Sequence, residues 1–531
     1  MFIKKLTKQV ICNLDEPVVS TPDGKLRGLV VDNTFIYRGI KYADARRFMP
    51  PTPVKPWEGV KESIIYGPVC PEIQTVQPDD NYTVPHVFYP QDEDCQYLNI
   101  WTQRINDPEA KRPVLVWFHG GGFSTGSGIE HFAYDGENMS RFGDVVVVTL
   151  NHRLNVLGYL DLSAYGEKYR YSGNAGNADL VEALRWVKRN ISAFGGDPDN
   201  VTIFGQSGGG GKVASLLQTP SADGLFHRAV IQSGIGRFGR RRKPEKSMAE
   251  TLLELFNLGP EQVSELETMP YWRFQEAFTR LGPDAGMAFG PTRDDDFYLG
   301  DIFEVGICEH AKTVPVLVGN VLGEFSQNFV TTVDGTEKNS WDKAKVLRIL
   351  RVKFGDDAEE AIRLHRAAYP DLPVQNLLFL DRIFRGGTMD YLHARAKAQC
   401  SAPTYGFMFR MEQPVYGGTL PWHNAEIPYV FHNADYIEPS YVPGITEKVQ
   451  DIVCGAWCHF AEKADPNVAG APFWAPFDEE SQAMMYFDEY SYVKSMEAEE
   501  ALFNFVDSHP IEMTRVVRQK QPKYFGGGPR V

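Results

Sequence analysis

The chain has 531 residues, of which 43% are hydrophobic and 23% are charged, and its formal net charge is −15. An acidic surface repels phosphate backbones, so we expect no nucleic-acid partner. No apolar run approaches the roughly 20 residues that a membrane span needs, and the basic start of the chain lacks the hydrophobic segment of a secretion signal. These features predict a globular cytoplasmic protein without a membrane span.

The length by itself favours two domains, but the sequence offers no place to divide them. It contains no Pro/Ser-rich linker, long charge block or internal repeat. We therefore predict one domain over residues 1–531. The segments 240–300 and 330–400 resemble helices and loops, and we expect them to form a cap over the carboxyl edge of a sheet, where such folds bind ligands.

Short apolar runs alternate with helical patterns along the chain. After an opening β-meander over residues 18–45, the runs at 113–118 and 145–150 are typical of strands buried on both faces. Residues 178–194 have helical periodicity. Four later runs predict further strands, at 201–204, 229–234, 314–319 and 404–409. This alternation predicts an α/β fold with a mostly parallel sheet and helices on both faces.

The pattern Gly205-x-Ser207-x-Gly209 stands between a predicted strand and a predicted helix. A serine on such a sharp turn has strained backbone angles and presents its hydroxyl above the sheet, and close packing requires the two glycines. The pattern alone is weak in a chain with 48 glycines. A phosphate-binding loop is excluded because its required positions hold Gln206 and Val213. The context predicts that Ser207 is a nucleophile.

A second glycine-rich segment, His119-Gly-Gly-Gly122, directly follows the predicted strand at 113–118. Successive glycines let several backbone N–H groups surround one oxygen, as in an oxyanion loop. The expected donors are the N–H groups of Gly121, Gly122 and Gly208. The alternative is a flexible glycine turn, and the nucleophile turn later in the same chain favours the oxyanion hole.

Five segments in chain order resemble the type-B carboxylesterase family, which also contains the cholinesterases. They begin at Glu93, His119, Asn151, Asn190 and Ala229. The resemblance runs from about residue 18 to about residue 505 and suggests a bacterial member. It implies a single α/β-hydrolase domain, a small-molecule ester as substrate, no metal or organic cofactor, and a triad in the order Ser, acid, His.

The family's acid segment has a Glu five residues after a Gly, and Gly319 and Glu324 have this spacing. The resemblance therefore implies Glu324 as the acid. The family usually has Asp-Glu-Gly here, whereas this chain has Gly-Glu-Phe, so the loop is expected to differ while the carboxylate stays in place. Asp381 and Asp390 are the alternatives.

His423 lies in a segment, residues 422–431, that is similar to the family's histidine loop. The resemblance implies that His423 takes the proton from the serine and that the acid orients the imidazole. Gln206, Ser233 and Glu426 match positions beside the family's triad and are expected to support it.

Cys70 and Cys95 match the family's first disulfide, and whether they are oxidised is open because a cytoplasm is reducing. The cholinesterases bind a quaternary ammonium on a Trp between these cysteines. This chain has no Trp there, only Tyr82, Phe88 and Tyr89. The residue before the nucleophile, commonly Glu in the family, is here Gln206. Both differences weaken cation binding.

The sequence therefore predicts a serine hydrolase that cleaves neutral small to medium carboxylic esters through an acyl-enzyme on Ser207. Hydrolysis of amides, carbamates or lipid esters by the same triad is an alternative. A non-catalytic binding relative of the cholinesterases is a second alternative, which the complete set of Ser207, Glu324 and His423 disfavours.

Overall fold

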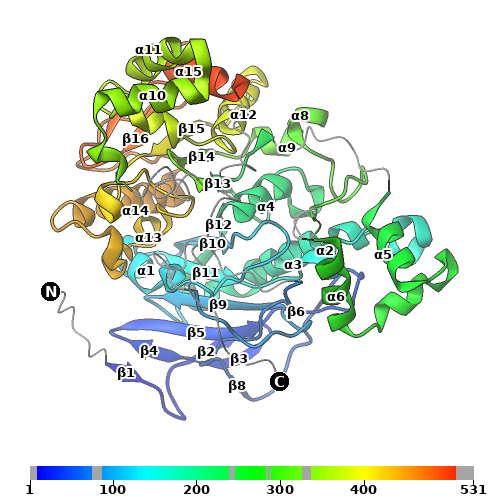
Figure 1. Ribbon diagram of the computed structural model, residues 1–531. Coiled ribbons are helices and arrows are strands. Elements are labelled where there is room, and N and C mark those ends of the chain that lie inside the picture. The colour runs from blue at the N-terminus through cyan, green and yellow to red at the C-terminus, as the bar shows by residue number, and fades with distance from the viewer. Residues whose placement is uncertain are drawn as a thin grey trace, which may run out of the picture.

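A twelve-stranded sheet runs through the computed structural model (Figure 1), which describes residues 9–73, 86–237, 246–282, 285, 289–325 and 336–509. In spatial order its strands are β1 (Val10–Ile11), β4 (Leu29–Val31), β5 (Thr34–Lys41), β9 (Tyr97–Thr102), β11 (Val146–Leu150), β10 (Arg112–Phe118), β12 (Gly196–Gln206), β13 (Arg228–Gln232), β14 (Val316–Val321), β15 (Thr404–Phe409), β16 (Ala483–Phe487) and β17 (Tyr492–Ser495).

The centre of the sheet is parallel and its edges are antiparallel. Every pair from β11 through β16 is parallel, whereas β1, β4, β5, β9 and β17 pair in antiparallel fashion. Strands β4 and β5 are joined by Asp32 and Asn33, whose φ angles of 45° and 71° suit a two-residue hairpin turn. The predicted parallel sheet is thus confirmed for the centre, and hairpin-connected strands extend it.

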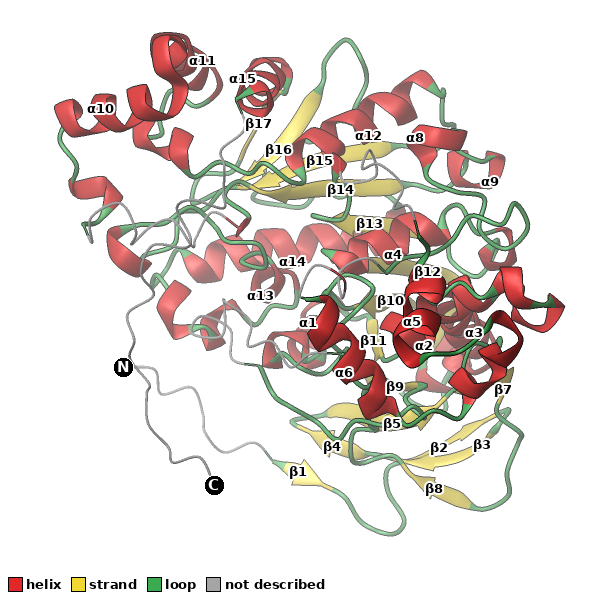
Figure 2. Ribbon diagram, turned by 45° about the vertical axis from the view of Figure 1, so that its right-hand side comes forward, coloured by secondary structure: helices red, strands yellow, loops and turns green. Residues whose placement is uncertain are grey.

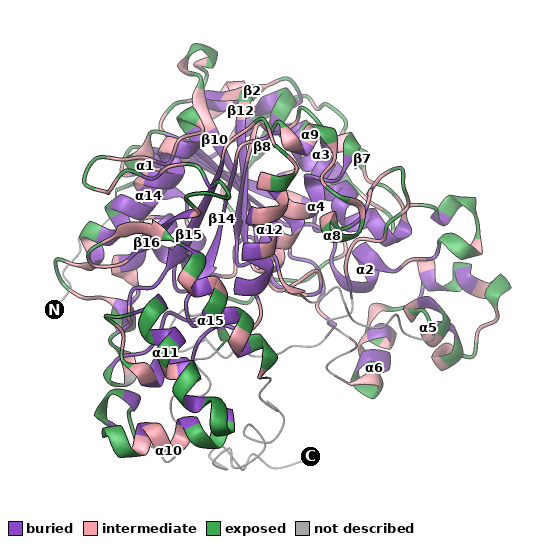
Figure 3. Ribbon diagram, turned by 90° about the horizontal axis from the view of Figure 1, so that it is seen from above, coloured by how far each residue is buried: buried purple, intermediate pink, exposed green. Residues whose placement is uncertain are grey.

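Helices cover both faces of the sheet, which Figure 3 shows nearly edge-on. One face carries α3 (Ala175–Asn190), α4 (Gly208–Leu216) and α12 (Arg385–Lys397), and the other carries α1 (Glu137–Gly143) and α14 (Thr446–Lys463). Side chains alternate between the faces along each strand. In β10, Val114 and Val116 pack toward α3 and α4, while Leu115 and Trp117 pack toward α14. This double burial explains the continuous apolar runs.

The predicted runs are confirmed as strands β10 to β15. Their ends differ from the expected ones by one or two residues, except that β12 begins earlier, at Gly196. The opening meander is confirmed as β2 (Val18–Thr21), β3 (Gly24–Arg27), β4 and β5. Smaller sheets join β2 and β3 to β8 (Val60–Glu62), and β6 (Ala43–Asp44) to β7 (Thr52–Pro53).

Two groups of helices stand apart from the sheet, one at the upper left of Figure 2 and the other at the right of Figures 1 and 3. The described part of segment 240–300 contains α5 (Met248–Phe256) and α6 (Tyr271–Leu281). The described part of segment 330–400 contains α10 (Lys343–Phe354), α11 (Ala358–Ala368) and α12, which packs on β14 as part of a helix layer. The remaining helices are α2 (Asn155–Tyr159), α8 (Ile302–Val305), α9 (Glu309–Lys312), α13 (Ile427–Val430) and α15 (Glu497–Ser508). None of the helices in the described ranges is long and apolar enough to cross a membrane.

Candidate active site

Ser207 occupies the turn between β12 and α4. Its φ of 58° and ψ of −127° lie in a region that a non-glycine residue adopts at a cost of about 1–3 kcal/mol. The turn is fixed by its own backbone, because the Ser207 N–H donates to the Gln232 carbonyl at 2.8 Å and the Gly211 N–H donates to the Ser207 carbonyl at 3.0 Å. A Cβ on Gly205 would stand 2.5 Å from the Gly209 carbonyl carbon. The predicted strand–turn–helix context is therefore confirmed, and so is the reason for the flanking glycines.

The glycines that follow β10 run directly beside this turn. Gly121 and Gly122 have φ angles of 80° and 62°, which L side chains rarely adopt. A Cβ on Gly120 would stand 3.4 Å from the Ser207 Cβ, and one on Gly208 would collide with the backbone of Gly122. The structure thus brings the predicted oxyanion donors and the predicted nucleophile to one place.

Glu324 and His423 meet at the carboxyl end of β14. The backbone of Glu324 forms a parallel bridge with Trp422, and a Glu324 carboxylate oxygen (Oε2) forms a short hydrogen bond with Nδ1 of His423. The Glu324 side chain is fully buried, and this burial raises its pKa to about 8. The Ser233 hydroxyl at 2.7 Å and the Val321 N–H at 3.0 Å donate to its other oxygen and oppose the rise. An imidazolium at His423 would stabilise the carboxylate further.

The two alternative acids have other partners. The Asp381 carboxylate accepts the N–H groups of Ile383 and Phe384 at 2.8 and 2.9 Å, and that of Arg385, the first residue of α12, and so fixes the turn that leads into this helix. Its burial and the nearby Glu324 raise its pKa to about 7. Asp390, within α12, pairs with Arg237 at 2.8 Å.

Two phenylalanine rings enclose the His423 imidazole. The Phe384 ring stacks on it at 5.0 Å with an interplanar angle of 9°, and the Phe325 ring lies 4.1 Å away at 33°. Sequence reasoning noticed Phe325 only as a departure from the family pattern and missed Phe384 altogether. Because the N–H of Phe384 itself donates to Asp381, this carboxylate also fixes the backbone that carries the stacked ring.

The three residues predicted to support the triad all lie beside it. The Gln206 side-chain amide donates to the carbonyl of His423, and Ser233 holds Glu324. Glu426 is buried, and its Oε1 accepts a hydrogen bond from Gln232 at 3.1 Å. Burial and the neighbouring Glu324 raise the pKa of Glu426 to about 8. Gln232 is a further contact that the sequence did not reveal.

Cys70 and Cys95 are free, buried thiols in the structure, so the pairing that the sequence left open is not formed there. Burial and the adjacent Cys70 raise the pKa of Cys95 well above its usual range. The backbone N–H of Leu154 donates to the Cys70 sulfur at 3.2 Å. Of the aromatic residues between the cysteines, Phe88 is 59% exposed and Tyr89 packs against Tyr66, while Tyr82 lies outside the described residues.

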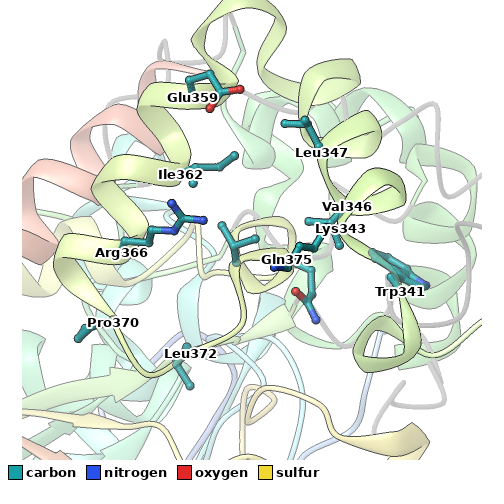
Figure 4. Close-up of a pocket in the computed structure, with 11 residues that line it drawn as sticks. Trp341, Lys343, Val346, Leu347, Glu359, Ile362, Arg366, Pro370, Leu372 and Gln375 are labelled. Carbon is teal, nitrogen blue, oxygen red and sulfur yellow. The ribbon is translucent and has the colours of Figure 1, made fainter.

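A cavity of about 670 Å³ lies elsewhere, between α10 and α11 (Figure 4). Val346 and Leu347 line it from α10, and Glu359, Ile362 and Arg366 line it from α11. None of the predicted site residues borders this cavity. The side chains of the predicted triad lie outside this cavity, at the carboxyl edge of the sheet.

Comparisons with known sequences point in the same direction as this geometry. The sequence profile of the carboxylesterase family matches residues 15–504. The para-nitrobenzyl esterase of Bacillus subtilis (strain 168) is 32% identical over 487 residues, which cover 89% of this chain and 94% of that protein. The phenmedipham hydrolase of Pseudarthrobacter oxydans is 31% identical over 499 residues, covering 89% and 95% respectively.

Solved structures show the same likeness. An esterase from the anaerobe Clostridium hathewayi, described as able to hydrolyse aliphatic aromatic polyesters, is 45% identical with a TM-score of 0.88, covering 95% of this chain and 100% of that one. A Geobacillus stearothermophilus carboxylesterase is 36% identical with a TM-score of 0.71, covering 92% and 99%. The fold is that of the α/β-hydrolases.

Proposed function

This chain belongs to the carboxylesterase family and is a carboxylic-ester hydrolase, and we propose that Ser207, His423 and Glu324 are its catalytic triad. The observation that carries this assignment is the hydrogen bond between Glu324 and His423. It joins the end of β14 to a distant loop, at the same sheet edge as the strained turn of Ser207. A carboxylate on Nδ1 leaves Nε2 as the nitrogen that exchanges a proton with the serine.

Acylation begins when the Ser207 hydroxyl attacks the ester carbonyl and His423 accepts its proton. The N–H groups of Gly121, Gly122 and Gly208 stabilise the negative oxygen of the tetrahedral intermediate. His423 then gives its proton to the leaving alcohol, and the acyl group remains on the serine. Glu324 stabilises the imidazolium that exists between these two transfers.

Deacylation repeats the sequence with water as the nucleophile. His423 takes a proton from the water, the same N–H groups stabilise the second intermediate, and the acid product leaves as Ser207 regains its proton. Through both steps the Gln206 amide holds the backbone of His423, and the rings of Phe325 and Phe384 restrict rotation of its imidazole.

The substrates that we propose are neutral esters of small to medium size. Gln206 places an uncharged amide where a carboxylate would attract a cation, and no Trp lies between Cys70 and Cys95. The Clostridium hathewayi esterase hydrolyses aliphatic aromatic polyesters, which are also uncharged. We therefore include short aromatic diesters in the proposed substrate class.

We also propose that the whole chain is one α/β-hydrolase domain with a cap made of segments 240–300 and 330–400. This proposal is supported by the peripheral position of α5, α6, α10 and α11 around a single continuous sheet (Figure 1). Differences in these helices between relatives would then change the substrate without changing the triad.

The test is hydrolysis of p-nitrophenyl esters from acetate to palmitate by the wild type and by Ser207→Ala. We expect the variant to lose at least about 10³-fold in kcat, because the nucleophile is gone. Retained activity would overturn the assignment of Ser207. Comparing acetylthiocholine with an uncharged thioester of the same acyl group tests the substrate class, and faster turnover of the choline ester would exclude the proposed preference.

A further inference from the structure

Lys212 is a buried cation beneath the glycine loop of residues 119–122, which we call the oxyanion loop. It lies in the second turn of α4 and is fully buried. Its Nζ donates to the carbonyl oxygen of His119 at 2.8 Å. Within the described part of the chain, no carboxylate lies within ion-pair distance of this ammonium. Burying an ammonium without a directly paired carboxylate is costly, and burial lowers the pKa of Lys212 to about 7.

Three successive carbonyls of the oxyanion loop are held by hydrogen bonds. The His119 carbonyl accepts from Lys212, and the Gly120 carbonyl lies 2.9 Å from Nδ1 of His119. The Gly121 carbonyl accepts from the N–H groups of Ser124 at 3.2 Å and Thr125 at 3.0 Å. In a trans peptide the C=O and N–H point in opposite directions. Fixing these carbonyls therefore fixes the direction of the N–H groups of Gly120, Gly121 and Gly122.

Lys212 differs from the other residues that hold these carbonyls because it comes from outside the loop. His119, Ser124 and Thr125 are local, whereas Lys212 is 93 residues away in the sequence. It belongs to the helix that begins directly after Ser207. The hydrogen bond from Lys212 thus joins the oxyanion loop to the element that carries the nucleophile.

The groups near Lys212 shift the protonation equilibria in and beneath the oxyanion loop. The rings of His119 and His152, the Cys70 thiol and the Glu130 carboxylate lie close enough to interact electrostatically with it, and the centroid of the Phe123 ring is 6.0 Å from its Nζ. Burial lowers the pKa of Lys212 to about 7, and burial together with Lys212 holds the pKa values of both histidines well below their usual range. Neutral His119 must carry its proton on Nδ1 to donate to a carbonyl. An amine keeps N–H donors whether or not it is protonated, so the Lys212 hydrogen bond persists in both forms.

We propose that Lys212 is a positioning residue of the oxyanion hole: its hydrogen bond to the His119 carbonyl sets the distance between the N–H donors of the oxyanion loop and the Ser207 hydroxyl. This inference rests on the function proposed above. Without the hydrogen bond the loop moves relative to the nucleophile, and the tetrahedral intermediate loses stabilisation while binding of the uncharged ester changes little.

The experiment compares Lys212→Met, which keeps the length of the side chain but has no donor, with Lys212→Gln, which keeps a donor. The matched control is Lys353→Met in α10. Lys353 is also buried enough to lower its pKa, to about 6, and its Nζ also donates to a backbone carbonyl, that of Leu377 at 3.3 Å, but it lies away from Ser207.

The readouts are kcat and KM on a p-nitrophenyl ester, the melting temperature, and the affinities of two inhibitors. One is a trifluoromethyl ketone, whose adduct with serine has an oxyanion, and the other is the matching ether, which forms none.

For Lys212→Met we expect kcat to fall about 10- to 100-fold with KM unchanged, because small displacements of catalytic groups have effects of this size. Its trifluoromethyl ketone affinity should fall by a similar factor, and its ether affinity should not. Lys212→Gln should recover part of the loss, and Lys353→Met should match the wild type. Unchanged kcat in Lys212→Met, or equal losses for ketone and ether, would overturn the proposal. If the Met variant does not fold, Lys212→Leu, which also has no donor, takes its place, and an unchanged ketone-to-ether ratio in it contradicts a positioning role. Activity of the wild type and its loss in Ser207→Ala test the proposed function separately.

Discussion

Ser207 and the oxyanion loop are held mainly by backbone contacts, whereas Glu324 and His423 are held by side chains from distant segments. On the first side, glycines bring the two backbones together, and the turn is closed by N–H to C=O hydrogen bonds. On the second side, a buried carboxylate, a serine hydroxyl and two phenylalanine rings fix the imidazole. The site therefore combines one part that backbone conformation holds in place with another that side-chain packing and charge hold in place.

The largest expected effect comes from the side of the site that contains Glu324 and His423. In Glu324→Gln, the imidazolium loses its carboxylate, and an amide can hold the histidine in the wrong tautomer. We expect kcat to fall about 10⁴-fold. The matched control is Glu426→Gln, because Glu426 is an equally buried carboxyl group that bonds Gln232 rather than His423. Steady-state kinetics on a p-nitrophenyl ester measure both, and similar losses in the two variants would contradict the assignment of Glu324 as the acid.

The part of the site that backbone contacts hold, Ser207 and the oxyanion loop, is tested by adding one methyl group. Gly208→Ala would push the Ala Cβ against the Gly122 backbone, so we expect kcat to fall about 10²-fold. Gly211→Ala is the control, because its Cβ would stand 3.5 Å from the Phe123 ring, an ordinary contact. Steady-state kinetics on a p-nitrophenyl ester should give a much lower kcat for Gly208→Ala than for Gly211→Ala. Equal kcat in the two variants would mean that the Gly122 backbone can shift to admit the methyl group without loss of catalysis.

The buried carboxyl groups predict a pH-dependent stability on the side of the site that contains Glu324 and His423. The folded pKa of Glu426 is about 8, above its ordinary value of 4.5. The unfolded chain therefore releases this proton first, and the stability that the protonated group contributes is present below pH 4.5 and lost as the pH rises toward 8. Relative to the wild type, Glu426→Gln should gain about 3 kcal/mol in unfolding free energy between pH 5 and pH 8. Urea unfolding at both pH values measures this, and a difference that does not change with pH would show that Glu426 ionises freely when folded.

The smallest expected effect concerns the stacked ring. In Phe384→Leu the imidazole of His423 loses one restraint, and we expect kcat to fall about tenfold with KM nearly constant. Phe303→Leu, an exposed position on α8, is the control. If KM rises instead while kcat holds, Phe384 contacts the substrate rather than orienting the histidine.

The contrast between the two sides also explains what the sequence could predict. The turn at Ser207 and the loop at 119–122 need glycine at set positions, so short patterns revealed them. The parallel centre of the sheet was likewise visible, because strands buried on both faces are apolar throughout. The choice of Glu324 over Asp381 required the family resemblance, since both are buried acids that follow apolar segments.

The supporting contacts could not be predicted because they join residues far apart in the chain. Phe384 stacks on His423 from a turn that the Asp381 carboxylate fixes just before α12, and no local pattern encodes this contact. Lys212 resembles an exposed helix residue in the sequence and is in fact fully buried, because the oxyanion loop covers it. Tertiary packing determines both the contact of Phe384 and the burial of Lys212, and neither helix propensity nor residue spacing predicts them.

The pairing of β10 with β12 has a consequence for how such an enzyme can be altered. Phe118 and Gly205 are partners in adjacent parallel strands, so the two chain segments that carry the oxyanion donors and the serine leave the sheet side by side. Their separation at that point equals the spacing between neighbouring strands, about 4.8 Å. Insertions at the exposed turn of Asp223 and Gly224, in the connection between β12 and β13, can therefore change the surface without moving the two segments apart. For a protein engineer, this register is the dimension to preserve, and exposed turns beyond it are the places to redesign.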